Sequence, residues 1–223
     1  MRKVNIAIDG PSGVGKSTVS KIIADRLNYT FINSGSIYRA IAKNVIDMDV
    51  DTRDKENVIK TLEQGMIQLL ENDHILLKGV DVTHQIRADY ISQITPNVAK
   101  IPEVREFVVD YIRHMTKKRK GYVIDGRDTT FKIMPHAEVK IFLWAQAEER
   151  ARRRMIQNEV LGYNTGFAEI LYEVQKRDEQ DMNRAVDPLH KTEDSEYIDC
   201  TALTIDEVAE KIINLAKEKS NKE

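Results

Sequence analysis

The segment from Val4 to Thr18, VNIAIDGPSGVGKST, decides the fold of this chain. Val4 to Asp9 predict a short buried strand, and apolar residues recur at helical spacing from Val19 to Leu27. Residues 10–17 read GPSGVGKS and fit the pattern G-x-x-x-x-G-K-[ST]. Strand, loop and helix in this order are the context that the pattern requires. The segment therefore predicts a loop that holds nucleotide phosphates, rather than an ordinary glycine turn before a helix.

The residue types of this loop explain how it would bind phosphate. Glycines let the backbone curl so that successive N–H groups point at phosphate oxygens, and the following helix adds its positive end. We expect Lys16 to reach the β- and γ-phosphates as a point charge. We expect the Ser17 hydroxyl to contact Mg²⁺.

Composition and charge exclude several classes of protein. The chain has 223 residues, with 34 Lys and Arg against 36 Asp and Glu, which argues against a basic coat for nucleic acid. No run approaches the roughly 18 apolar residues of a membrane span. Cys200 is the single cysteine, which excludes an internal disulfide and a Cys-rich metal site. The residues after Met1 form no secretion signal, so we expect a cytoplasmic protein without nucleic-acid or membrane partners.

Strand and helix patterns alternate along most of the chain, which indicates an α/β protein with a parallel sheet covered on both faces. Short strands are expected at residues 4–9, 29–33, 122–125, 138–144 and 197–200. Helices are expected at residues 17–27, 36–48, 55–70, 102–120, 148–161 and 167–181, with a last helix that begins at a capping box of Thr204 and Glu207. Residues 75–78 and 80–82 flank Gly79 and predict a small β hairpin.

The loop predicts a nucleotide but leaves the reaction open. A GTPase needs an N-K-x-D string to read its base, and the chain has none. Motor and transport ATPases usually carry an acidic pair at the end of a core strand, whereas here Asp125 is followed by Gly126. The remaining class is a phosphoryl transferase that acts on a small molecule.

Such an enzyme must neutralise charge on both donor and acceptor phosphates, and arginine binds phosphate bidentately. Arg39 lies about one turn into a predicted helix, and Arg127 follows a buried strand in the segment DGRD. Arg177, Asp181 and Arg184 are spaced so that all three would share one helix face. Arg177 with Asp181, or Arg127 with Asp128, could instead be simple ion pairs.

A further group of arginines, Arg150, Arg153 and Arg154, shares one face of an earlier predicted helix. With these residues in view, the chain resembles the bacterial cytidylate kinase family of nucleoside monophosphate kinases, from Ile6 to about Ala216. Eight motifs stand in the order of that family: IDGPSGVGKST (residues 8–18), SGSIYR (34–39), DVTHQIR (81–87), PEVRE (102–106), DGRD (125–128), VKIFL (139–143), EERARRR (148–154) and KRDEQDMNRA (176–185).

The resemblance implies a fold, a domain plan and a reaction. The fold is a three-layer P-loop kinase fold with a central parallel sheet, an acceptor-binding insertion that contains the hairpin, and a short helical lid. The plan is one kinase domain over residues 1–223, with its core near residues 1–33, 96–148 and 185–219, the insertion near 34–95 and the lid near 149–184. The reaction transfers the γ-phosphoryl of Mg-ATP to CMP or dCMP in a monomer.

The resemblance also assigns site residues. ATP and its Mg²⁺ would be bound by Gly10, Pro11, Ser12, Gly13, Val14, Gly15, Lys16, Ser17, Thr18, Arg153 and Arg154, with Ser17 as the metal contact. CMP would be bound by Ser34, Arg39, Arg105, Arg127, Asp128, Arg177, Asp181 and Arg184. The residues that act on the transferred phosphoryl would be Lys16, Arg127, Arg154 and Arg184.

The chain departs from the family pattern in three places: Thr129, Thr130 and Phe131 follow the DGRD motif, Pro96 stands where a serine is common, and Trp144 ends a strand that usually closes on an acid or a small polar residue. The first two departures lie near the expected base pocket and bear on selectivity for cytosine. Two other functions stay open: a kinase with the same loop but another acceptor, such as UMP, AMP or shikimate, and a nucleotide-binding module without turnover.

Overall fold

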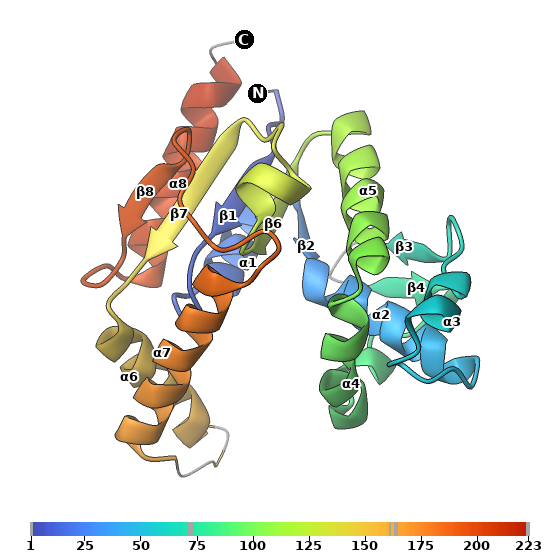
Figure 1. Ribbon diagram of the computed structural model, residues 1–223. Helices are drawn as coiled ribbons and strands as arrows, with labels where there is room; N and C mark the ends of the chain where they lie inside the picture. The colour runs from blue at the N-terminus through green and yellow to red at the C-terminus, as the bar shows by residue number, and fades with distance from the viewer. Residues whose placement is uncertain (1, 71–73, 161, 163–164, 222–223) are drawn as a thin grey trace. The chain divides into compact units, whose positions relative to one another are not determined.

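The computed structural model describes residues 2–70, 74–160, 162 and 165–221 (Figure 1). The chain divides into two units: Met1–Tyr29 with Lys120–Glu223, and Thr30–Arg119. The second unit spans a longer stretch of sequence than the insertion near residues 34–95 that the resemblance implies.

A five-stranded sheet forms the centre of the fold. Its strand order is β2-β6-β1-β7-β8, with bounds β1 Ile6–Asp9, β2 Thr30–Asn33, β6 Tyr122–Gly126, β7 Val139–Trp144 and β8 Glu196–Asp199. β6, β1, β7 and β8 run parallel. β1 is buried at all four positions, as expected for a strand paired on both sides in a covered sheet. The predicted α/β class with a central parallel sheet is confirmed.

Two helices of the first unit pack on each other beside this sheet: α1 (Lys16–Leu27) and α8 (Ile205–Asn221). α1 also packs against β6, and α8 against β7. The predicted capping box starts α8, because the Glu207 carboxylate accepts hydrogen bonds from the Thr204 amide and hydroxyl at 2.8 Å each.

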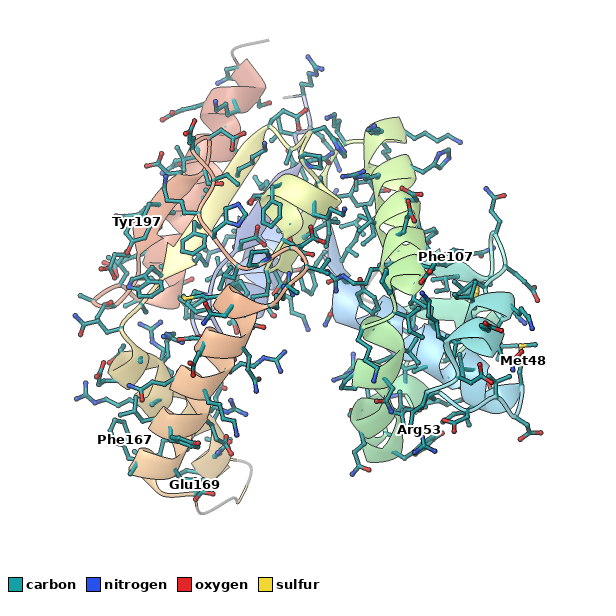
Figure 2. All side chains as sticks on the ribbon, in the orientation of Figure 1. Met48, Arg53, Phe107, Phe167, Glu169 and Tyr197 are labelled. Carbon is teal, nitrogen blue, oxygen red and sulfur yellow. The ribbon has the colours of Figure 1, made fainter. Side chains whose placement is uncertain are left out.

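Two further helices, α6 (Ala147–Val160) and α7 (Phe167–Asn183), pack against each other as a pair. Figure 2 labels Phe167 at the start of α7. Ala151, Ile170 and Val174 are buried between the two helices and form a small core of their own. The predicted helix at residues 167–181 is confirmed within two residues at each end, and the one at residues 148–161 is confirmed up to residue 160, because residue 161 lies outside the described residues.

The second unit contains four α-helices and a small antiparallel sheet among its described residues: α2 Ser34–Asp47, α3 Lys55–Lys60, β3 Ile67–Leu69, β4 Ile75–Leu77, β5 Val80–Asp81, the short 3₁₀ helix η2 Gln85–Arg87, α4 Asp89–Ala99 and α5 Pro102–Lys118. β4 pairs with β5 as the predicted hairpin and with β3 on its other side. α2 packs against α4 and α5. The loop after α2 carries the labelled residues Met48 and Arg53 in Figure 2.

The predicted helix over residues 55–70 is wrong after its first turns. α3 ends at Lys60, and the Thr61 hydroxyl donates to the Val58 carbonyl at 2.7 Å. Gly65 then adopts φ +81° in a turn that leads into β3. The apolar residues of this segment fit a helix by spacing, but Ile67 and Leu69 pair with Leu77 and Ile75 of β4 instead. A tertiary strand pairing has overridden the local pattern.

No helix among the described residues has both the length and the apolar character needed to cross a membrane.

Candidate active site

Three loops leave the carboxyl edge of the sheet together. In the strand register, Asp9 at the end of β1 lies opposite Gly126 of β6 and Phe142 of β7. The loop after β1, the DGRD segment at the end of β6 and the junction between β7 and α6 therefore start from one edge. Ligands of open α/β sheets bind at this edge.

The phosphate loop runs from Gly10 to Gly15, between β1 and α1, so the predicted strand, loop and helix are confirmed. The loop lies directly on the end of β7: a Cβ added at Gly10 would stand 2.3 Å from the Leu143 carbonyl oxygen. Only glycine permits this approach, because a methyl group there would collide with backbone. α1 begins at Lys16, one residue before the predicted start.

Lys16 is folded into the loop and is only 6% exposed. Its Nζ donates hydrogen bonds to the carbonyl oxygens of Gly10 and Pro11, both at 2.8 Å. Burial lowers the Lys16 pKa from 10.5 to about 7, and the nearby Arg127 charge acts in the same direction. The carboxylates of Asp125, Asp9 and Asp181 oppose this shift. Burial disfavours the charged form of Lys16, and a phosphate bound beside it would stabilise that form.

Ser17 contacts a carboxylate that the sequence did not assign to the site. Its Oγ donates to Asp125 Oδ2 at 2.7 Å, across 108 positions of sequence. Burial raises the pKa of Asp125, and the hydrogen bond from Ser17 opposes the rise. A hydroxyl and a carboxylate are the hard oxygen donors that Mg²⁺ prefers. Within the described part of the chain, no three His, Cys, Asp or Glu side chains cluster as a metal site, so phosphates and water would have to complete the ligand shell.

The signal for Asp125 was present in the sequence, because it closes a buried strand. Because Gly126 follows it in place of a second acid, the sequence pattern alone gives Asp125 no role in the site. The register of β6 against β1 places Asp125 opposite Ile8, two residues before the loop.

Asp181 joins two of the predicted acceptor-binding arginines. Arg127 Nε donates to Asp181 Oδ2 at 2.7 Å, and Arg177 Nε lies 3.5 Å from Asp181 Oδ1. The Asp181 side chain is buried, whereas that of Arg177 is largely exposed. The pair at positions 177 and 181 therefore belongs to a wider cluster rather than to an isolated surface ion pair.

Arg184 lies one residue beyond the helix that carries Arg177 and Asp181, so the prediction that it is part of that helix is wrong by one residue. α7 ends at Asn183, and Arg184 has an extended backbone with ψ 144°. The chain turns at Asp187, where φ is +48°, and the Leu189 amide bonds back to the Asp181 carbonyl. Arg184 is held by two contacts: its Nη2 lies 3.4 Å from Asp128 Oδ2, and its Nε donates to the Asp187 carbonyl at 2.6 Å.

The threonines that depart from the family pattern bind a buried carboxylate. Asp9, with no exposed surface, accepts hydrogen bonds from the Thr129 amide at 2.9 Å, the Thr130 amide at 2.8 Å and the Thr130 hydroxyl at 2.7 Å. These residues begin a π-helical turn, η3 (Thr129–Ile133). The residue before the phosphate loop thus fixes the segment that follows Asp128.

The two aromatic departures pack within the first unit. The Phe131 ring lies 4.3 Å from the His190 ring, between centroids. The Trp144 ring faces the Arg150 guanidinium at 5.8 Å. Pro96 lies inside α4 of the second unit, next to Thr95, whose hydroxyl donates to the Ile91 carbonyl.

The three arginines of α6 have different surroundings. Arg150 is buried, Arg153 donates to the Cys200 carbonyl at 2.7 Å, and Arg154 lies 4.0 Å from the Glu173 carboxylate on the exposed side of the pair of helices. The spacing predicts one shared helix face, but the three side chains have different environments.

The remaining predicted residues belong to the second unit. Ser34 is the first residue of α2, Arg39 lies in its second turn, and Arg105 lies in the first turn of α5. The two arginines are half-buried.

Known proteins are similar to this chain in sequence and in fold. The family model described as cytidylate kinase matches residues 6–218. A cytidylate kinase of Mycoplasmopsis synoviae (strain 53) is 64% identical over 215 residues, which cover 96% of this chain and 99% of the relative. A cytidylate kinase of Mycoplasmopsis agalactiae (strain NCTC 10123 / CIP 59.7 / PG2) is 50% identical over 217 residues, which cover 97% and 98%.

The crystal structure of an uncharacterized protein from Eubacterium ventriosum ATCC 27560 shares the fold, with a TM-score of 0.57 at 14% identity over 97% of this chain and 99% of that one. The sequence matches confirm the family that the eight motifs predicted. This chain belongs to the cytidylate kinase family.

Proposed function

We propose that this protein transfers the γ-phosphoryl group of Mg-ATP to CMP or dCMP, giving ADP and CDP or dCDP. The observation that carries the proposal is the cluster at the sheet edge. The phosphate loop with Lys16 stands there with Arg127 and Arg184, each of which faces a carboxylate of the same unit. The donor and acceptor phosphates repel each other, and the positive charges of Lys16, Arg127 and Arg184 would offset that repulsion.

On the donor side, the loop N–H groups and Lys16 bind the ATP phosphates. Ser17 and Asp125 would hold Mg²⁺ together with those phosphates. The ion supplies charge neutralisation on the phosphate oxygens. Arg153 and Arg154 belong to the lid, which covers ATP and keeps water from the γ-phosphoryl.

On the acceptor side, Arg127, Arg184 and Arg39 bind the phosphate of CMP. Arg177 and Asp181 contact its sugar, and Ser34, Arg105 and Asp128 lie around the base. The cluster supports this assignment, because Arg127 and Arg184 are held by Asp181 and Asp128 in orientations set before substrate arrives. The incoming phosphate becomes a second anion for each arginine.

The chemistry needs no dedicated general base, because the attacking phosphate oxygen of CMP is already ionised at neutral pH. Attack occurs in line with the departing ADP oxygen. Lys16, Arg127, Arg154 and Arg184 stabilise the charge of the transferred phosphoryl. Catalysis thus consists of positioning and charge stabilisation.

We further propose that the enzyme acts as a monomer in the cytoplasm on nucleotide substrates alone. Sedimentation velocity with and without ATP and CMP checks the monomer, and a stable dimer at micromolar concentration would contradict it.

An assay of ADP release with Mg-ATP tests the function. The acceptors are CMP, dCMP, UMP and AMP, with a blank that lacks any acceptor. Turnover with CMP and dCMP alone supports the proposal. Equal turnover with UMP or AMP would replace it with a broader monophosphate kinase, and ATP binding without turnover on any acceptor would leave a binding module.

A further inference from the structure

Arg150 is the largest fully buried side chain of the described residues, with 1% exposure. Neither the loop motif nor the proposed mechanism uses it. It lies in the first turn of α6, directly after β7. A buried guanidinium needs partners for its five N–H groups, so its contacts show what it holds in place.

The guanidinium of Arg150 bridges three segments of the first unit. Nη1 donates to the carbonyl oxygen of Ser12 in the phosphate loop at 2.8 Å. Nε donates to the carbonyl of Ala145, the residue directly after β7, at 2.9 Å. Nη1 and Nη2 donate to the two carboxylate oxygens of Asp178 on α7, at 3.0 and 2.5 Å. The Asp178 pair is bidentate, which fixes the plane of the guanidinium.

The contact with Ser12 determines how one loop peptide is turned. In a planar trans peptide the carbonyl and the N–H of the next residue point in opposite directions. Because the Ser12 carbonyl faces Arg150, the Gly13 N–H faces the other side of the loop. Gly13 has φ +74°, and a Cβ added there would lie 3.4 Å from Arg150 Cβ, so the loop rests on α6 at this residue.

Asp178 extends the connection to the acceptor cluster. It lies on α7 beside Arg177 and one turn before Asp181, which accepts from Arg127. Arg150 is therefore attached on one side to the phosphate loop and on the other to the helix that carries the acceptor residues.

We propose that Arg150, oriented by Asp178, is a positioning residue of the ATP site: it fixes the Ser12–Gly13 peptide so that the Gly13 N–H is presented to a phosphate oxygen. This inference rests on the proposed function, since it needs the loop to bind ATP. The competing explanation is a purely structural tie between α6 and α7, which would change stability but leave ATP affinity intact.

The test compares Arg150→Met, Arg150→Lys and the double variant Arg150→Met/Asp178→Leu. Titration calorimetry gives the Kd of each for ATP and for CMP, and thermal unfolding gives the midpoint. Replacing both members of a buried ion pair by apolar side chains of similar size commonly preserves stability. We therefore expect the double variant to unfold closer to the wild-type temperature than Arg150→Met does, and yet to bind ATP about tenfold more weakly, as one lost hydrogen bond to a charged ligand predicts. The CMP Kd changes less.

Arg150→Lys keeps the charge but cannot reach three acceptors in a fork, so its ATP affinity falls in the same direction. The matched control is Lys120→Met/Glu138→Leu, another partly buried ion pair, located at the amino ends of β6 and β7. It should leave the ATP Kd unchanged.

The Gly13 amide resonance in a ¹⁵N-labelled sample gives a direct readout. In the wild type it shifts strongly when ATP binds, and in the double variant the shift is smaller. Native ATP affinity and a native Gly13 shift in the stable double variant would overturn the role of Arg150 while wild-type binding upholds the ATP site. A wild-type protein that binds no ATP would overturn the inference and the proposed function together.

Discussion

At the scale of single residues, the lowered pKa of Lys16 predicts proton uptake on ATP binding. In the free enzyme burial brings this pKa to about 7, so at pH 8 the amine is mostly neutral. The triphosphate favours the ammonium and raises the pKa again, so ATP binding at pH 8 takes up a proton, up to about one per ATP. Calorimetry in two buffers with different ionisation enthalpies measures this number.

The same linkage sets the direction of the pH dependence. ATP binds the ammonium form, so its affinity should be constant below pH 7 and fall by about tenfold per pH unit above it. Lys16→Met should abolish the proton uptake and reduce kcat by about 100-fold or more, because the charge at the transferred phosphoryl is lost. Lys140→Met, a lysine on β7 paired with Asp194, is the matched control. Proton uptake that persists in Lys16→Met would assign the titrating group elsewhere.

Asp128 gives a second prediction at this scale. Its buried carboxylate lies 3.4 Å from Arg184, and the proposed acceptor site uses both residues. Asp128→Ala should raise the KM for CMP by about tenfold, as loss of a charge-assisted contact predicts, while the KM for ATP changes little. Initial rates with each substrate varied in turn measure both constants. Asp194→Ala removes an exposed carboxylate as control, and equal changes in the two KM values would contradict the placement of Asp128.

At the scale of secondary-structure elements, the capping box of α8 should contribute to stability but not to substrate binding. Thr204 Oγ1 accepts a hydrogen bond from the Glu207 amide at 3.2 Å. The Glu207 carboxylate in turn accepts hydrogen bonds from the Thr204 amide and hydroxyl. Thr204→Ala should lower the free energy of unfolding by about 1 kcal/mol, a shift of about 2–4 °C in Tm for a chain of this size. Thr204→Ser should restore most of it. A changed KM for ATP with unchanged Tm would be the contrary result.

Elements with local signals could be predicted from the sequence, and those decided by distant partners could not. The residues that determine the phosphate loop and the α8 capping box lie within a few positions of one another in the sequence. Residues 61–70 do not, because β3 exists only through its pairing with β4. The spacing of Arg184 predicts a place on α7, yet that helix ends at Asn183 and leaves Arg184 as the residue directly after it.

At the scale of the whole molecule, the site depends on contacts between residues far apart in the sequence. Arg127 and Asp181 are 54 positions apart, Ser17 and Asp125 are 108, and Arg150 and Ser12 are 138. Spacing along one chain cannot reveal such pairs. Motif identity places Arg127 and Asp181 among the site residues, but it assigns no role to Asp125 or Arg150. Asp125 lies in β6 and Arg150 follows β7, and the parallel register of these strands with β1 brings both residues to the phosphate loop.

The division of the chain gives a last prediction, on hydrogen exchange. Every residue proposed to bind ATP belongs to the first unit, whereas Ser34, Arg39 and Arg105, proposed to bind CMP, belong to the second. A ligand slows the exchange of amides in the elements that it stabilises. ATP alone should therefore protect residues 10–20 and leave α2 and α5 unchanged, and CMP alone should protect amides of residues 34–39 and 102–108.

Deuterium uptake followed by mass spectrometry, at each ligand concentration about 100 times its Kd, measures these segments directly. The variant Lys16→Met serves as control, since it should lose protection by ATP and keep protection by CMP. If CMP protects only residues of the first unit, then Ser34, Arg39 and Arg105 do not bind the acceptor, and the acceptor site consists of Arg127, Asp128, Asp181 and Arg184 and their neighbours. If ATP protects α2 or α5 by itself, the donor site extends beyond the phosphate loop and the lid.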